Sequence, residues 1–185
     1  MKRKTLLSLF ADRRGVAAIE LGIVVPVLAL LVAGSIEVGN ALYQQFQLNS
    51  AVTSASNYAI VNSSQVNATN GGTLASNIAT IVESSYSAGW ANVTVVVNDG
   101  PATTVTSGSS SSSGTASNAG FCYCPTGTAS STTWGASVTC GSSCGSGGTG
   151  GKFVTIVATK AYTPFFSSYG FVTGNLTASA LVQVQ

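Results

Sequence analysis

The chain has 185 residues, of which only 6% are charged, against about 25% in an average soluble domain. Five of its seven basic residues lie within the first fourteen positions, and the few charges beyond Asn40 cancel one another. A nucleic-acid-binding surface needs Lys and Arg spread over the folded domain, so no nucleic-acid partner is expected. The chain has no His, which removes the commonest general base and metal ligand.

The first predicted element is an apolar helix near the N-terminus. Residues 21–36 carry no charge and lie between Glu20 and Glu37. Counted from Val16, the apolar stretch is long enough to cross the ~30 Å hydrocarbon core of a bilayer as a helix. A buried core helix is the alternative, but this stretch is too long and too uniformly apolar for so small a chain. The pattern therefore predicts a transmembrane helix over 16–38.

The distribution of basic residues predicts how this helix is oriented. Positive charge is retained on the cytoplasmic side of a membrane, so residues 1–15 are expected to form a basic cytoplasmic leader and 39–185 an exported domain. A removable secretory signal is the main alternative, because it also has a basic start and an apolar core. Such a core is usually only about 7–15 residues long, whereas this one continues into further helical sequence.

Glu20 is an unusual residue for this position. A carboxylate inside a membrane segment is costly and indicates function. Glu20 lies four residues after Val16, which itself follows Arg13-Arg14-Gly15. This arrangement resembles type IV prepilins. The resemblance implies cleavage after Gly15, a mature N-terminus at Val16, and pairing of Glu20 with the amino terminus of a neighbouring subunit. Alternatively, Glu20 lies near the membrane edge and extends to the lipid headgroups.

The stretch 14–59 resembles, more specifically, the TadE-like family of the tight-adherence (Flp) pilus system. The matching features are Arg14-Gly15, Ala17-Ala18-Ile19-Glu20, Pro26 within the apolar run, and Ile36-Glu37-Val38-Gly39 at its end. Pro26 is consistent either with a tolerated kink in a membrane helix or with remodelling of the helix during assembly.

The resemblance implies a minor pilin or pseudopilin that supports pilus biogenesis, adhesion or biofilm formation. Its partners would be other pilin-like subunits, the pilus assembly machinery of the bacterial inner membrane, and a prepilin peptidase. The alternatives are an envelope binding protein that stays anchored and never enters a filament, or a type II secretion pseudopilin. Processing after Gly15 would distinguish the stable anchor from the pilin.

Beyond the membrane the pattern predicts an α+β, pilin-like domain. Apolar residues at helical spacing, from Leu42 and Phe46 to Ala59, extend the first helix to about Val61. A second helix is expected, with Thr73 as its N-cap and with an apolar face. The strands expected after it are 92–97, 152–161 and 176–184, the last alternating with a period of two. A small antiparallel sheet packed on a helix combines these parts economically.

A Gly/Ser-rich insert, 98–151, separates the first and second of these strands. Its runs 107–113 and 145–151 are almost pure Ser and Gly and are expected to be loop or disorder. The insert also carries all the cysteines, namely Cys122, Cys124, Cys140 and Cys144. In an exported domain these predict disulfides. A bond between Cys122 and Cys124 would close a strained small ring, so we favour bonds that join the pair Cys122 and Cys124 to the pair Cys140 and Cys144. In the cytosol a four-Cys zinc site would compete.

Catalytic residues do not emerge from the sequence. The carboxylates of the exported domain, Glu83 and Asp99, are isolated, and most Ser residues lie in the insert. No nucleophile with an adjacent base can be assembled from these residues. We therefore expect no enzymatic activity, no resident metal and no cofactor.

Overall fold

The computed structural model describes residues 16–166 and 174–185, which fall into two compact units. Unit 1 comprises the chain up to Ala41 together with Pro164–Val172, and unit 2 comprises Leu42–Thr163 together with Thr173–Gln185. Residues 1–15, the predicted leader with Gly15, lie outside the described residues. The α+β class predicted from the sequence is confirmed, with a long apolar helix followed by an antiparallel sheet.

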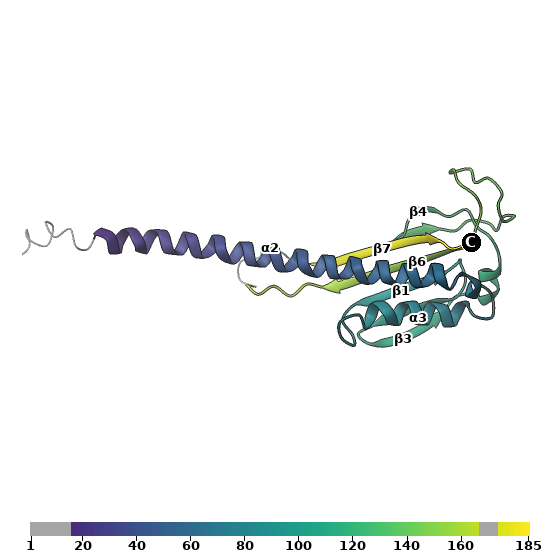
Figure 1. Ribbon diagram of the computed structural model, residues 1–185, viewed down its shortest axis with the longest axis horizontal. Coiled ribbons are helices and arrows are strands. Elements are labelled where there is room, and N and C mark those ends of the chain that lie inside the picture. Colours follow the sequence, from purple (N-terminus) through teal and green to yellow (C-terminus); the bar gives the residue numbers. More distant parts are fainter. Residues whose placement is uncertain (1–15, 167–173) are drawn as a thin grey trace, which may run out of the picture. The chain divides into compact units, whose positions relative to one another are not determined.

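The first described element is helix α2, Val16–Val61, which is 46 residues long (Figure 1). The predicted end of the stem, at about Val61, is confirmed. Pro26 lies inside the helix, and a proline at that position cannot donate a backbone hydrogen bond to the preceding turn. Polar side chains elsewhere on the helix bond back to it, as when the Ser35 hydroxyl donates to the Leu31 carbonyl at 2.8 Å. Such back-bonding lets a helix carry hydroxyl groups without unpaired donors.

Unit 2 is built on a five-stranded sheet in the order β3-β2-β1-β6-β7, in which every neighbouring pair is antiparallel. The strands are β1 (Asn92–Val97), β2 (Ala102–Thr106), β3 (Ser109–Ser113), β6 (Phe153–Ala161) and β7 (Asn175–Gln183). The three predicted strands are confirmed to within one residue at each end. Two short strands, β4 (Thr126–Thr128) and β5 (Ser131–Thr133), form a separate hairpin in the insert (Figure 1).

The expectation that the Ser-rich run is loop or disorder was wrong, because this run forms β3. Ser107 and Gly108 both have positive φ, 51° and 80°, as a tight two-residue hairpin turn requires. This turn returns the chain along β2, where Thr104 pairs with Ser111. All five residues of β3 are exposed. The composition therefore indicated correctly that little is buried, while backbone pairing with β2 still determined the conformation.

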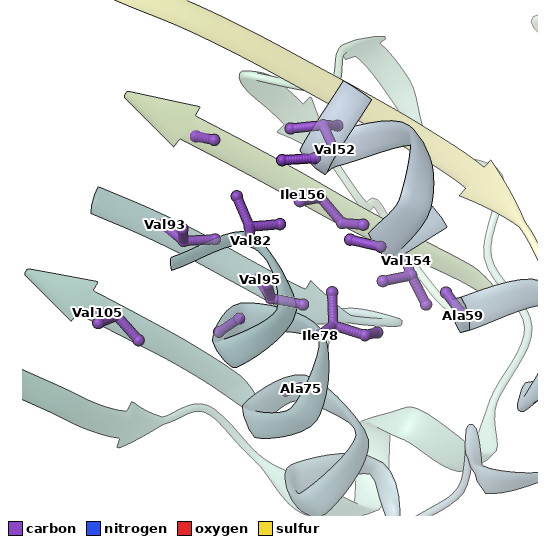
Figure 2. Packing of buried hydrophobic residues seen from close by; sticks show 14 of the residues in the cluster. Val52, Ala59, Ala75, Ile78, Val82, Val93, Val95, Val105, Val154 and Ile156 are labelled. Carbon is purple, nitrogen blue, oxygen red and sulfur yellow. The ribbon is translucent and has the colours of Figure 1, made fainter. Parts of the chain in front are cut away.

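Helix α3, Gly71–Glu83, packs with the later part of α2 on one face of the sheet. Figure 2 shows Ile78 and Val82 of α3 and Val52 of α2 directed at strand residues that include Val95 and Ile156. The helix begins at Gly71 with Asn70 as its N-cap, three residues before the N-cap predicted at Thr73.

The face that α2 presents to this core agrees with the predicted stripe from Leu48 to Ala59 but not at the N-terminal end of that stripe. The buried positions are Leu48, Ala51, Val52, Ala55 and Ala59. Leu42 and Phe46, which were predicted to belong to the buried stripe, are 53% and 68% exposed. Leu48 and Val52 supply the larger side chains of this face, and the small Ala side chains between them allow the helix to approach the sheet closely.

Candidate functional site

The N-terminal part of α2 presents apolar side chains on every side. Within the described residues, α2 is the one helix long and apolar enough to cross a membrane, and its apolar window has no buried residue. A helix that is apolar all round requires burial in a larger core or in a bilayer. Glu20 and Pro26 both lie in this segment, and Glu20 is exposed. Its carboxylate is thus accessible to a partner outside the chain.

Glu37, the carboxylate at the other end of the apolar run, is fully buried. Its Oε2 accepts hydrogen bonds from the backbone N–H groups of Phe165, at 3.0 Å, and Phe166, at 3.3 Å. The two phenylalanines lie in the connection between β6 and β7, and they belong to unit 1 with Glu37. The sequence analysis recorded Glu37 only as part of a motif. The sequence did contain one indication of its importance, because Glu37 is a second acidic residue at the C-terminal end of the apolar run.

An exposed apolar surface also follows the run along α2. Leu42, Tyr43 and Phe46 are 53%, 62% and 68% exposed, and their spacing of three and four residues places them on one helical face. Monomeric soluble domains seldom expose a row of large apolar side chains without using it for an interaction. This row is a candidate contact for another helix.

The predicted disulfides are confirmed. Cys122 pairs with Cys140 and Cys124 with Cys144, so both bonds join the two clusters, and no free cysteine remains. Each bond closes a loop of about twenty residues, which in the chain-entropy description is worth about 3 kcal/mol. The insert has little apolar surface to bury, and the disulfides supply the missing stabilisation.

Tyr123 lies between the disulfide-bonded residues Cys122 and Cys124 and is buried. Its ring meets that of Trp134 edge-on, with centroids 6.0 Å apart. Burial raises the pKa of the Tyr123 phenol, and the negative charge of Asp99 raises it further. The phenol is therefore held in its neutral form, as part of the small core of the insert.

Asn98, a residue that the sequence analysis did not single out, fastens the insert to the sheet. It is fully buried and has a φ of 55°. Its side-chain amide donates to the backbone carbonyls of Ala119, at 3.2 Å, and Phe121, at 2.5 Å, while its Oδ1 accepts from the N–H of Phe153 at 3.1 Å. The sequence Asn-Asp-Gly-Pro after β1 could have indicated a turn at this position, because Asn tolerates the left-handed backbone conformation.

The four charged groups of unit 2 all have structural contacts. Glu83 accepts a hydrogen bond from the Gly89 N–H, and Asp99 accepts from the Asn118 amide at 3.4 Å. Lys152 donates to the Val66 carbonyl at 3.0 Å. The ammonium of Lys160 lies 5.1 Å from the centre of the Trp90 ring, within the range of a cation–π interaction.

Metal-ligating side chains are scattered in the described part of the chain. Across residues 16–166 and 174–185, no group of three or more His, Cys, Asp or Glu side chains is placed to hold a metal ion. The cysteines are engaged in disulfides, which corresponds to the exported alternative considered for them and not to the zinc site.

Comparison with known protein families identifies the N-terminal segment. Residues 15–56 match the model of the TadE-like protein family. The match confirms the resemblance seen in the sequence, and it covers the apolar part of α2, Glu20, Pro26, Glu37 and the exposed row that follows. The matched segment makes up less than a quarter of the chain. No curated protein and no solved structure matches the chain.

Proposed function

We propose that this chain is a minor pilin or pseudopilin-like structural component of a tight-adherence pilus system. The observation that carries the proposal is the coincidence of the TadE-like segment with an apolar, outward-facing helix that bears an exposed carboxylate five residues into it. Residues 1–15 are the cytoplasmic leader, 16–38 span the inner membrane, and 39–185 are exported. Other pilin-like subunits, the assembly machinery and a prepilin peptidase are its partners.

The charge on Glu20 gives the proposal its mechanism. A lone carboxylate is costly in a membrane, whereas a paired one costs much less. Cleavage after Gly15 creates an ammonium group at Val16 and removes the five basic residues that hold the leader in the cytoplasm. Pairing of Glu20 with the amino terminus of a neighbouring subunit would then favour one register of helix packing over the others.

The exposed row on α2 supports incorporation into a filament. Leu42, Tyr43 and Phe46 follow the apolar run and are uncovered in the single chain. A helix that serves only as an anchor has no need of large apolar side chains beyond the lipid. Packing against the helix of a second subunit would bury them, and about 25 cal/mol per Å² of apolar surface would favour that contact.

The decisive experiment is N-terminal sequencing of the protein from cells that contain an active prepilin peptidase. We expect Val16 as the mature terminus, and Gly15→Leu should block processing because it places a bulky side chain at the cleavage site. An intact leader on the wild-type protein would contradict the pilin proposal and leave a TadE-like anchor.

Variants of Glu20 test the pairing separately from insertion. Glu20→Leu should leave membrane insertion intact or improve it, while reducing incorporation into sheared pili. A matched variant, Glu20→Leu with Leu21→Glu, keeps the carboxylate in the helix but turns it by about 100° around the axis. If this variant assembles as the wild type does, the helix needs only a charge and the proposed register is wrong.

A second candidate function is an envelope binding protein that stays anchored in the membrane. The disulfide-bonded insert favours it, because two disulfides stabilise an exposed segment with little core of its own. Full retention of the protein in the membrane, with an uncleaved leader and no material in sheared pili, is the outcome that supports this candidate. In both cases the proposed role is structural and not catalytic.

A further inference from the structure

We propose that Pro164–Phe166, at the start of the connection between β6 and β7, is a second membrane-contacting element that binds the lipid interface beside α2. The partner is the headgroup and upper acyl region of the bilayer at the C-terminal end of the apolar run. This inference rests on the proposed insertion of α2 into a membrane, and it assigns a lipid-binding role to residues outside the TadE-like segment.

The position of this element follows from its contacts with Glu37. Glu37 directly follows the uncharged run 21–36, so it marks the level at which the helix leaves the hydrocarbon. Its carboxylate accepts the backbone N–H groups of Phe165 and Phe166 at 3.0 and 3.3 Å. Both phenylalanines are thereby fixed at that level, within the same compact unit as the apolar part of α2.

The side chains at this level are suited to lipid. Phe165 is 69% exposed, although it is held beside a helix whose own apolar side chains face outward. Phe166 lines a groove together with α2 residues between Val25 and Ile36, so this residue lies against the apolar run. Phe is among the side chains with which interfacial segments enter the boundary between headgroups and acyl chains, and these two lie beside the end of the apolar run.

The hydrogen bonds explain how an irregular segment is tolerated there. Non-helical backbone near the hydrocarbon is costly unless its polar groups are satisfied by protein. Glu37 accepts two of the N–H groups concerned, and Pro164 has no N–H to satisfy. The carboxylate is itself fully buried, and the hydrogen bonds that it accepts offset part of the cost of burying it. Glu37 therefore acts as a positioning residue for the aromatic segment.

The test uses the full chain reconstituted into vesicles of phosphatidylcholine and phosphatidylglycerol, with the phosphatidylcholine either unbrominated or brominated on its acyl chains. The wild-type chain has two tryptophans, Trp90 and Trp134, both in unit 2. The variants are Phe165→Trp, Leu30→Trp within the apolar run, and Phe121→Trp as a matched exposed aromatic of unit 2. Brominated lipid quenches only tryptophan that touches the acyl region.

We expect brominated lipid to reduce the emission added at position 165 about twofold, because interfacial aromatic side chains contact the upper acyl chains. The fluorescence contributed by the tryptophan at position 30 should fall further in brominated lipid. The fluorescence contributed by the tryptophan at position 121 should not change. In the Phe165→Trp background, Glu37→Ala should abolish most of the quenching at position 165. Glu37→Gln retains an acceptor oxygen and should preserve it.

The outcomes separate this inference from the function on which it rests. Quenching at position 30 without quenching at 165 would overturn the lipid contact while leaving α2 inserted. A blue-shifted but unquenched tryptophan at position 165 would indicate packing against a second copy and would likewise overturn it. Absence of quenching at position 30 would show that α2 itself is not inserted, and the inference would fall with the anchor. Equal quenching at 121 and 165 would remove the specific role of the segment.

Discussion

Replacement of Asn98 by Ala tests how the disulfide-bonded insert is fastened to the sheet. The substitution removes the amide that donates to the carbonyls of Ala119 and Phe121 and the oxygen that accepts from the Phe153 N–H. These three groups come from a 3-10 helix, the segment that follows it, and the start of β6. Asn98 is fully buried, so water cannot easily take its place.

The expected loss follows from the number of bonds and from the backbone. Three hydrogen bonds at a net value of about 1 kcal/mol each contribute about 3 kcal/mol. The left-handed φ of 55° costs Ala roughly a further 1–2 kcal/mol, which Asn tolerates better. We therefore expect Asn98→Ala to lower the free energy of unfolding by about 4–5 kcal/mol.

Equilibrium urea unfolding of the oxidised full chain in detergent micelles measures this change. Tryptophan emission reports on unit 2, because Trp134 packs near Tyr123 and Trp90 lies at the edge of the core. With a slope of about 2 kcal/mol per molar urea, the midpoint should fall by about 2 M. Asn77→Ala, an exposed position on α3, is the control and should change stability by less than about 0.5 kcal/mol.

The variant Asn98→Gly separates the two contributions. Gly adopts the left-handed conformation without strain but makes none of the side-chain bonds, so it should lose about 3 kcal/mol. A Gly variant as stable as the wild type would show that only the backbone conformation matters. If both variants lay within about 0.5 kcal/mol of the wild type, the proposed role of Asn98 would be refuted.

Two further predictions concern unit 2. Thr103 is buried, and its hydroxyl has no hydrogen-bond partner among the described residues. Replacing it by Val should therefore raise the free energy of unfolding by about 1 kcal/mol. A lower urea midpoint for Thr103→Val would mean that the hydroxyl is bonded, for example to a buried water. For Tyr123, whose folded pKa is raised by burial and by Asp99, the unfolded phenol ionises first, at a pH of about 10. The stability of the wild type should therefore be complete below that pH and fall as the pH rises through the folded pKa. Urea midpoints of Tyr123→Phe should fall less over this range, and identical profiles would contradict the assignment.

The features of the fold that depend on local sequence pattern were predictable from the sequence. The end of α2 was predicted at about Val61 and the bounds of β1 to the residue, because continuous apolar sequence, Ala-rich helical spacing and a run of valines each indicate one conformation. The disulfide prediction followed from topology and spacing alone. These features depend on local pattern, and local pattern is what a sequence displays directly.

The features that were missed depend on contacts between distant residues. β3 is a strand because β2 offers it a backbone edge, although its own serines bury nothing. Leu42 and Phe46 have the spacing of a buried stripe, but the part of the stripe that is buried in the core begins only at Leu48. Asn98 and Glu37 gain their roles from carbonyl and N–H groups far along the chain, which no local pattern shows.

The two carboxylates that flank the apolar run differ in their environments, because one is buried and the other is exposed. Glu37 is fully buried and accepts backbone N–H groups of its own chain, so the single chain already compensates the cost of its charge. Glu20 is exposed on a helix that is apolar on every side, so in the proposed membrane its charge requires compensation from outside the chain, by water, lipid headgroups or another subunit. Loss of Glu37 should therefore alter the single chain, whereas loss of Glu20 should alter only what the chain assembles with. That difference is why Glu20, and not Glu37, is the residue on which the pilin proposal depends.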